Sequence, residues 1–265
     1  MVFRGVLKKL KSELDKEVQY FLELPDDFIH FNLLLNKKLN LRFLGYECLS
    51  CGEDKTIFRQ GFCYDCFFKS PLTGDWIMRP ELSTAHLNQE DRDLDYEKAI
   101  QLQPHIVYLA NSGDVKVGIT RKSQIPTRWI DQGAHEAIPI LETPNRYLAG
   151  VAEVALKEHI SDKTNWRDML RNDIVQRDLW VVQHKLKPHL PEEVIDYYIE
   201  NPEITEINFP VLEYPQKLKS LNFKNQLSYS GRLVGIKGQY LIFEDHSVLN
   251  VRANSGFLIE LSIAD

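Results

Sequence analysis

Two closely spaced pairs of cysteines constrain the fold of this chain more than any other sequence feature. All four cysteines lie within one short segment, as Cys48-Leu-Ser-Cys51 and Cys63-Tyr-Asp-Cys66. Each pair turns two thiolates to the same side of a tight turn, and two such turns supply the four tetrahedral ligands of a structural zinc ion. Gly52 follows the first pair, where such a turn often needs a positive φ angle. The spacing therefore predicts one structural Zn²⁺ ion bound by these four cysteines.

Two disulfides or a redox-active pair would be the other uses of such cysteines. Residues 1–15 alternate apolar residues with Lys and Glu, so they lack the continuous apolar core of a secretory signal. Charged residues also interrupt every apolar stretch before it is long enough to cross a bilayer. We therefore expect a cytoplasmic protein with no membrane association, and disulfides are rare in that compartment. We expect His86 at the surface or in a hydrogen bond, because four thiolates already complete the ligand set.

The overall composition is that of an ordinary globular protein. The chain has 265 residues, of which 43% are hydrophobic and 26% are charged, and its formal net charge is −6 at pH 7. Proteins that coat nucleic acid usually carry a basic surplus, because much of their affinity comes from neutralising phosphates. Any nucleic-acid binding by this chain must therefore use a local basic groove.

The pattern of strands and helices predicts a mixed α+β protein in three parts. Residues 1–95 would be β-rich and contain the four-cysteine zinc ribbon, with a strand over residues 39–44 that alternates apolar and polar side chains. Residues 100–203 would form an α/β domain with a small antiparallel sheet flanked by helices. Residues 204–265 would form a small β-barrel or a curled sheet. In one arrangement, the N- and C-terminal strands share a sheet around the zinc, and the α/β domain is inserted between them.

The predicted α/β domain begins with a hairpin of two strands, over residues 105–110 and 115–120. A first helix then carries Arg128, and a longer helix over about residues 145–160 carries Glu153. Glu153 lies among apolar residues, where a carboxylate is costly to bury without a partner. A salt bridge or a functional role is therefore expected for Glu153.

This hairpin and the helices after it resemble the GIY-YIG nuclease superfamily over roughly residues 104–170. Ile106-Val107-Tyr108 stands at the first motif and Lys116-Val117-Gly118 at the second. Arg128, Glu153 and Asn165 match an arginine, a metal-binding glutamate and an asparagine that follow in the superfamily. Two positions differ from its pattern. Lys116, or Val117 if the register slips by one, replaces the second-motif tyrosine, and Ile106 replaces the first glycine. The whole chain is also similar to an uncharacterised bacterial family of unknown function.

The resemblance implies a metal-dependent endonuclease that hydrolyses phosphodiester bonds of DNA or RNA. Tyr108 would accept or relay the proton of the attacking water, together with Lys116 if a nearby cation such as Arg128 lowers the pKa of that lysine. Arg128 would hold the phosphate with its fixed fork of donors. Glu153 would bind one Mg²⁺ or Mn²⁺ ion, and Asn165 would orient the substrate or a metal-bound water.

Each of these side chains also has a purely structural interpretation. The structural alternatives are a packed strand aromatic for Tyr108, an ion pair with Asp131 or Glu136 for Arg128, a salt bridge for Glu153 and a helix cap for Asn165. Trp129 and Trp166 are expected to be core residues rather than platforms on which bases stack.

Two further functions stay open beside the nuclease. One is a catalytically inactive nucleic-acid-binding module that keeps the fold, which the replacement by Lys116 favours. The other is a protein-interaction module, which agrees with the acidic net charge. In the C-terminal part, Arg232, Lys237 and Tyr240 would form either an oligonucleotide-binding face or part of a plain structural barrel. The choice between DNA and RNA and the oligomeric state stay open.

Overall fold

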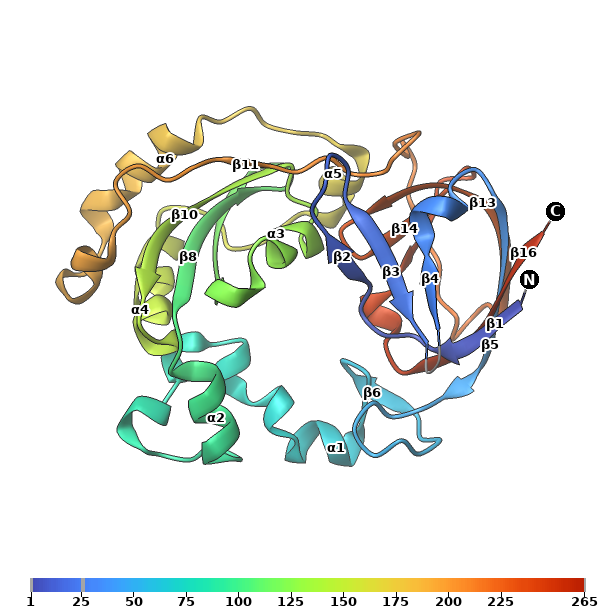
Figure 1. Ribbon diagram of the computed structural model, residues 1–265, viewed down its shortest axis with the longest axis horizontal. Helices are drawn as coiled ribbons and strands as arrows, with labels where there is room; N and C mark the ends of the chain where they lie inside the picture. Colours follow the sequence, from blue (N-terminus) through green and yellow to red (C-terminus); the bar gives the residue numbers. More distant parts are fainter. Residues whose placement is uncertain (1, 25–26, 265) are drawn as a thin grey trace. The chain divides into compact units, whose positions relative to one another are not determined.

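The computed structural model describes residues 2–24 and 27–264. The chain forms two compact units, the first made of residues 1–68 and 207–265 and the second of residues 69–206. The first unit joins both ends of the chain, blue and red in Figure 1, whereas the second unit is continuous in sequence.

The first unit is built on an open seven-stranded sheet with the strand order β1-β16-β5-β13-β14-β15-β12. Its strands are β1 (Val2–Val6), β5 (Lys38–Tyr46), β12 (Lys219–Ser220), β13 (Ser228–Lys237), β14 (Tyr240–Phe243), β15 (Ser247–Asn250) and β16 (Phe257–Ala264). Neighbouring strands are antiparallel, except that β12 and β15 are parallel. Since β5 pairs with both β13 and β16, strands from the two ends of the chain share one sheet.

Smaller elements complete the first unit. They are a three-stranded sheet of β2 (Lys11–Glu13), β3 (Gln19–Glu23) and β4 (Phe28–His30), the 3-10 helices η1 (Phe31–Leu34) and η9 (Arg252–Asn254), and a hairpin of β6 (Ile57–Arg59) and β7 (Phe62–Cys63). The helix α1 (Tyr64–Lys69) also belongs to the first unit, except for Lys69, with which the second unit begins. The side chain of Asn32 fastens η1 to the three-stranded sheet. It accepts a hydrogen bond from the backbone N–H of Tyr20 at 2.8 Å and donates one to the carbonyl of Val18 at 2.9 Å.

The second unit contains a four-stranded antiparallel sheet with the strand order β11-β10-β8-β9. Its strands are β8 (His105–Asn111), β9 (Val115–Arg121), β10 (Glu136–Thr143) and β11 (Thr205–Glu206). Because β8 and β9 are buried along almost their whole length, both faces of this part of the sheet are covered. Side chains alternate between the two faces. Leu109 and Val117 therefore belong to one face, and Tyr108, Lys116 and Gly118 belong to the other.

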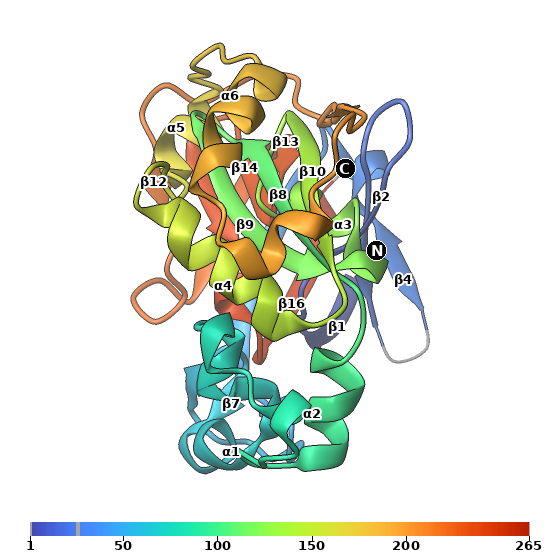
Figure 2. The ribbon, with the colours of Figure 1, turned by 90° about the vertical axis from the view of Figure 1, so that its left-hand side faces the viewer.

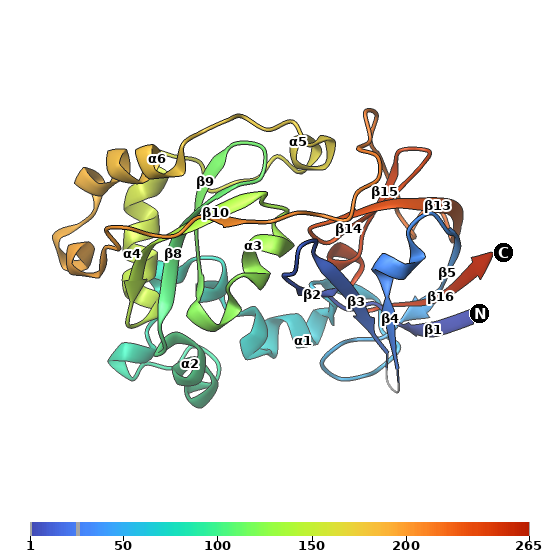
Figure 3. The ribbon, with the colours of Figure 1, turned by 45° about the horizontal axis from the view of Figure 1, so that its top comes forward.

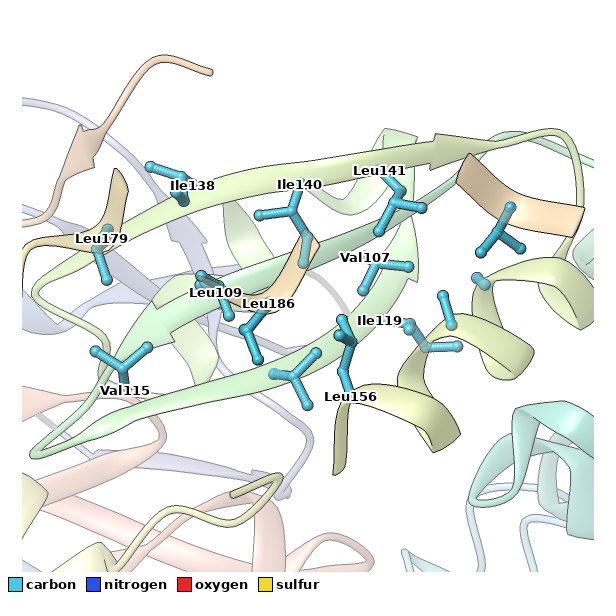
Figure 4. Packing of buried hydrophobic residues seen from close by; sticks show 14 residues of the cluster. Val107, Leu109, Val115, Ile119, Ile138, Ile140, Leu141, Leu156, Leu179 and Leu186 are labelled. Carbon is cyan, nitrogen blue, oxygen red and sulfur yellow. The ribbon is translucent and has the colours of Figure 1, made fainter. Parts of the chain in front are cut away.

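Helices of the second unit surround this sheet. They are α2 (Leu94–Gln101), α3 (Thr127–Asp131), α4 (Arg146–Lys157), α5 (Trp166–Arg171) and α6 (Leu179–Leu186), with the 3-10 helices η2 (Pro71–Thr73), η3 (Asp75–Ile77), η4 (Pro80–Leu82), η5 (Ala85–Leu87), η6 (Lys122–Gln124), η7 (Lys187–His189) and η8 (Glu192–Tyr197). Figure 2 shows α4 lying along the sheet, and Figure 4 shows Leu156 of α4 and Leu186 of α6 packed into the hydrophobic core. The helix α4 begins after Asn145, whose side chain accepts the N–H of Leu148 at 3.0 Å.

The segment that precedes β8 packs against α4 within the same unit. A Cβ atom on Gly150 of α4 would lie 2.5 Å from the backbone nitrogen of Glu81, so only glycine fits this contact. The fully buried carboxylate of Glu97 holds the segment in shape by accepting three backbone N–H groups at 2.7–3.1 Å. These contacts set the position of α4 and of the charged side chains that it carries.

The predicted mixed α+β fold is confirmed. The strand expected over residues 39–44 is β5, and the predicted hairpin is β8 and β9. Of the two forms considered for the C-terminal strands, the observed one is an open sheet, and no closed barrel forms among the described residues. Within the same described ranges, none of the helices combines the length and the apolar character that crossing a bilayer requires.

Candidate functional site

The four cysteines converge on one point of the first unit. The turn after β5 carries Cys48 and Cys51, whereas Cys63 ends β7 and Cys66 lies in α1. Their sulfur atoms all lie within 4.8 Å of one another. A tetrahedral zinc ion with Zn–S bonds of about 2.3 Å separates its sulfurs by about 3.8 Å. The predicted cluster is therefore formed, and it has the dimensions of a metal site with four thiolate ligands.

Local backbone geometry explains why these two turns form. Gly52 and Gly61 have positive φ angles of 69° and 86°. The backbone N–H of Cys63 donates to the sulfur of Cys48 at 3.3 Å. Burial raises the pKa of Cys48, but hydrogen bonds from the backbone of Cys51, Cys63 and Ser50 outweigh it and lower that pKa to about 6. Cys48 therefore favours the thiolate form that binds metal. In Cys66, a hydrogen bond with Ser50 lowers the pKa, but hydrogen bonds with the other three cysteines and burial outweigh it and raise that pKa to about 12.

In the second unit, Tyr108 lies at the centre of the other predicted site. It is fully buried on β8, opposite Gly118 of β9, and its ring packs edge-on against Trp129 of α3 at 6.0 Å. A Cβ atom on Gly118 would lie 2.7 Å from the Tyr108 hydroxyl oxygen, so the glycine makes room for the phenol. The phenol therefore lies across the hairpin, with its hydroxyl above β9.

The Tyr108 hydroxyl is surrounded by charged and polar groups. Burial raises the pKa of Tyr108, while the positive charge of Arg128 and the side chain of Gln132 oppose this rise and Glu153 adds to it. In the part of the chain that the structure describes, this hydroxyl has no hydrogen-bond partner of normal geometry. The side chains of Arg128 and Gln132 therefore lie close enough to interact with the hydroxyl, and a shift of either could form a hydrogen bond of normal geometry with it.

Lys116 lies on the same face of the hairpin and is only 5% exposed. Its ammonium donates to the hydroxyl of Thr164. Burial, together with the positive charge of Arg128, lowers the pKa of Lys116 to about 7, although the negative charge of Asp162 opposes the fall. Lys116 is therefore divided between its charged and neutral forms near neutral pH.

Glu153 projects from α4 and is 8% exposed. Its Oε2 atom pairs with Nζ of Lys157 at 3.3 Å, and the same ammonium lies 3.4 Å from Oδ2 of Asp162. Burial raises the pKa of Glu153, and the charges of Lys157 and Arg146 oppose that rise. The carboxylate is thus held by cations inside a largely apolar helix face. We refer to Tyr108, Lys116, Arg128 and Glu153 as the Tyr108 cluster.

Three residues near the cluster were not singled out from the sequence. Arg146 begins α4 and donates to the carbonyls of Trp76 and Ile77 at 3.2 and 2.8 Å, while its charge acts on both Glu153 and Arg128. Thr164 contacts Lys116 only because the fold brings the two residues together, so no local sequence pattern indicates it. By contrast, Lys157 lies four residues after Glu153 on one helix, a spacing at which ion pairs are expected, so this signal was present in the sequence.

Asn165 lies at the start of α5 and is exposed. Its side chain caps the helix by accepting the N–H of Arg167 at 3.1 Å. It also lines an open cavity of about 1150 Å³, which Thr164 lines as well. Among the described residues, the lining of this cavity includes none of the four members of the Tyr108 cluster. The cavity therefore approaches the cluster from the side of Thr164.

The remaining candidates have structural contacts. Trp129 is a core residue, and His86 stacks on Tyr147 with ring centroids 4.6 Å apart. In the first unit, Lys237 is 1% exposed with its ammonium above the rings of Phe209 and Tyr214, so it does not belong to an exposed basic face. In the same C-terminal part, Arg232 pairs with Glu244 at 3.1 Å and Tyr240 is half-buried. Trp166 lies in the second unit, and the guanidinium of Arg167 lies over its ring at 4.4 Å.

Comparison with known proteins relates most of this chain to one family. The model of the family described as "Protein of unknown function (DUF2797)" matches residues 36–259. The match begins just before β5 and ends within β16, so it includes the cysteine cluster and the whole second unit. No curated protein and no solved structure gives a significant match. Because the family model covers well over half of its length, the chain belongs to the DUF2797 family.

Proposed function

We propose that this protein hydrolyses phosphodiester bonds of nucleic acid with the assistance of a divalent metal ion, at the Tyr108 cluster, as in GIY-YIG nucleases. The observation that carries the proposal is the convergence of four side chains that are up to 45 residues apart in sequence. They come from two paired strands and two helices, yet their charges act on one another in a mostly buried site. Perturbed, mutually close titratable groups of this kind are typical of catalytic sites.

Each member of the cluster suits one part of the reaction. The neutral form of Lys116 accepts the proton of the attacking water, since its pKa of about 7 matches neutral pH. The Tyr108 hydroxyl, which has no partner of normal geometry among the described residues, orients that water or a phosphate oxygen. Arg128 supplies parallel N–H donors to the phosphate. The charge that develops on the phosphoryl oxygens is thereby balanced by fixed cations.

The carboxylate of Glu153 has the donor chemistry that a divalent metal requires. Mg²⁺ and Mn²⁺ prefer oxygen ligands, and Mg²⁺ needs only one or two protein carboxylates. Glu153 would hold such an ion, which when bound supplies Lewis-acid stabilisation of the phosphate. The ion pair of Glu153 with Lys157 must open for this binding.

In the first unit, the cysteine cluster would hold Zn²⁺ as a closed structural site, because all four positions are thiolates.

A cleavage assay tests this function directly. Labelled single- and double-stranded DNA and RNA are incubated with Mg²⁺ or Mn²⁺ and with the wild type, Glu153→Gln or Arg128→Gln. The matched controls are Glu142→Gln, whose carboxylate forms an exposed ion pair with Lys122, and Arg167→Gln on α5. We expect cleavage by the wild type and both controls, and a loss of at least a hundredfold in the two cluster variants. Equal activity of all five proteins would place the reaction elsewhere.

A catalytically inactive nucleic-acid-binding module is the second candidate. Two observations favour it: Tyr108 is completely buried, and Glu153 already has Lys157 as its counter-ion. This module would bind the same oligonucleotides with a steep dependence on salt and would cleave none of them. Salt-sensitive binding without cleavage under any metal would therefore replace the nuclease by the binding module.

A further inference from the structure

An open cavity of the second unit is lined by Thr164, the residue that accepts the hydrogen bond of Lys116. We call it the basin; its lining comes from the turn between β8 and β9, the segment from residue 159 to 165, the loop from α5 to α6, and α6 itself. Figure 3 shows this loop running beside the β8–β9 turn. The backbone N–H of Val175 donates to the carbonyl of Gly113 at 2.6 Å, and the Asn111 side chain donates to the carbonyl of Val175 at 3.0 Å. The loop is thus fastened to the hairpin, and the basin has a built wall.

The charged residues that line the basin differ in whether they form ion pairs. Asp114 pairs with Arg177 at 3.1 Å, so this acid is already neutralised. The other two acids of the lining, Asp168 and Asp173, share Arg171. By contrast, the exposed side chains of Lys163 and Lys185 belong to no ion pair within residues 2–24 and 27–264. Since Arg171 balances only one of the two acids that it contacts, these seven groups sum to a net charge of +1, and Lys163 and Lys185 are the cations among them that an anionic ligand can pair with.

Two hydroxyl groups add polar contacts to these cations. Ser112 is 3% exposed and lines the basin, and its hydroxyl has no hydrogen-bond partner among the residues that the structure describes. A buried hydroxyl of this kind costs free energy unless a ligand or water satisfies it. Thr164 also lines the basin and accepts the hydrogen bond of Lys116, so it connects the basin with the Tyr108 cluster. A ligand in the basin would therefore contact Thr164, which joins it to Lys116 of the cluster.

We propose that the basin binds a single-stranded segment of nucleic acid and passes it to the Tyr108 cluster. The proposal rests on the function proposed above and names its substrate class. The volume of about 1150 Å³ exceeds the 300–1,000 Å³ of typical small-ligand pockets, which suits an extended strand better than one nucleotide. A duplex presents its phosphates on a wide cylinder that rests on the rim, whereas a single strand can lower a phosphate to Ser112. Lys163 and Lys185 then neutralise neighbouring phosphates of that strand.

Salt-dependent binding tests the basin independently of cleavage. A fluorescein-labelled oligothymidylate is titrated without added divalent metal against the wild type and the double variant Lys163→Gln/Lys185→Gln. The matched control is Lys69→Gln/Lys98→Gln, which removes the same charge from the second unit away from the basin. For single strands, each lost phosphate contact lowers the slope of log K against log salt by about 0.7. We expect the basin variant to lose about 1.4 of this slope and the control to retain it.

A second variant and a second probe complete the test. Ser112→Ala, which removes only the hydroxyl, is expected to weaken binding of the oligothymidylate about threefold to tenfold and to leave the salt slope unchanged. A duplex that contains the same strand should bind all of these proteins equally. Equal slopes in the basin variant and the control, or equal losses for duplex and single strand, would overturn the proposal. Because binding is measured without metal, loss of cleavage alone would refute the proposed reaction and leave the basin standing.

Discussion

Replacing Lys116 by methionine should remove a pH dependence from the stability of the second unit. Methionine has a similar length and no charge, so the change deletes the buried amine while it keeps most of the packing. Burial lowers the pKa of Lys116 from its ordinary value of 10.5 to about 7 in the folded chain. Between these pH values the unfolded chain binds more protons than the folded chain, so stability rises with pH in this window. Below pH 7 the lysine is charged in both states, and its contribution no longer changes.

The size of the effect follows from the same two values. A change of 1 in pKa corresponds to about 1.4 kcal/mol, so the full window is worth about 5 kcal/mol. Between pH 7 and pH 9, the free energy of unfolding of the wild type should rise by about 2–3 kcal/mol relative to that of Lys116→Met. Lys116→Met also loses the hydrogen bond to Thr164, which lowers the free energy of unfolding by only about 1 kcal/mol.

Urea unfolding followed by tryptophan fluorescence measures the free energy of unfolding of the second unit, which contains Lys116. All four tryptophans lie between residues 69 and 206, so the signal reports on the second unit alone. Lys237 is a second buried lysine, with a pKa lowered to about 8 by burial, but it belongs to the first unit. The control is Lys122→Met, which removes an exposed lysine and should keep the slope of the wild type. Parallel curves for the wild type and Lys116→Met from pH 6 to pH 9 would refute the reasoning.

Three further predictions concern the metal sites and the packing of the hairpin. Purified protein should contain one equivalent of zinc by elemental analysis, and Cys51→Ser should lose the metal and lower the free energy of unfolding of the first unit by several kcal/mol. Lys157→Met should raise the affinity for Mn²⁺ about tenfold in calorimetry, because a charge-assisted hydrogen bond of about 1.5 kcal/mol no longer competes for the carboxylate; an unchanged affinity would argue against metal binding there. Gly118→Ala should cost about 1–3 kcal/mol of stability, since the new methyl group meets the Tyr108 hydroxyl, whereas Gly45→Ala, which meets nothing within 4 Å, should cost little.

The sequence by itself determined the features that depend on neighbouring residues. Two CxxC turns with glycine at positive φ bring four sulfurs together within a segment of nineteen residues, so the cysteine cluster could be predicted from spacing alone. The β8–β9 hairpin was equally clear, because two short strands rich in apolar residues flank a turn that contains Gly113. The cap by Asn165 and the ion pair between Glu153 and Lys157 also follow from local spacing.

Only the tertiary structure decided what is joined across long distances in sequence. The pairing of β5 with β13 and β16 places residues about 190–220 positions apart side by side, and many registers of alternating strands would bury equivalent side chains. The burial of Lys116, its contact with Thr164 and the placing of Lys163 and Lys185 beside one cavity depend on how α4, α5 and α6 pack around one hairpin. Side-chain identity determines which groups can ionise or donate, but packing determines how much water reaches them, and that sets their pKa and their partners.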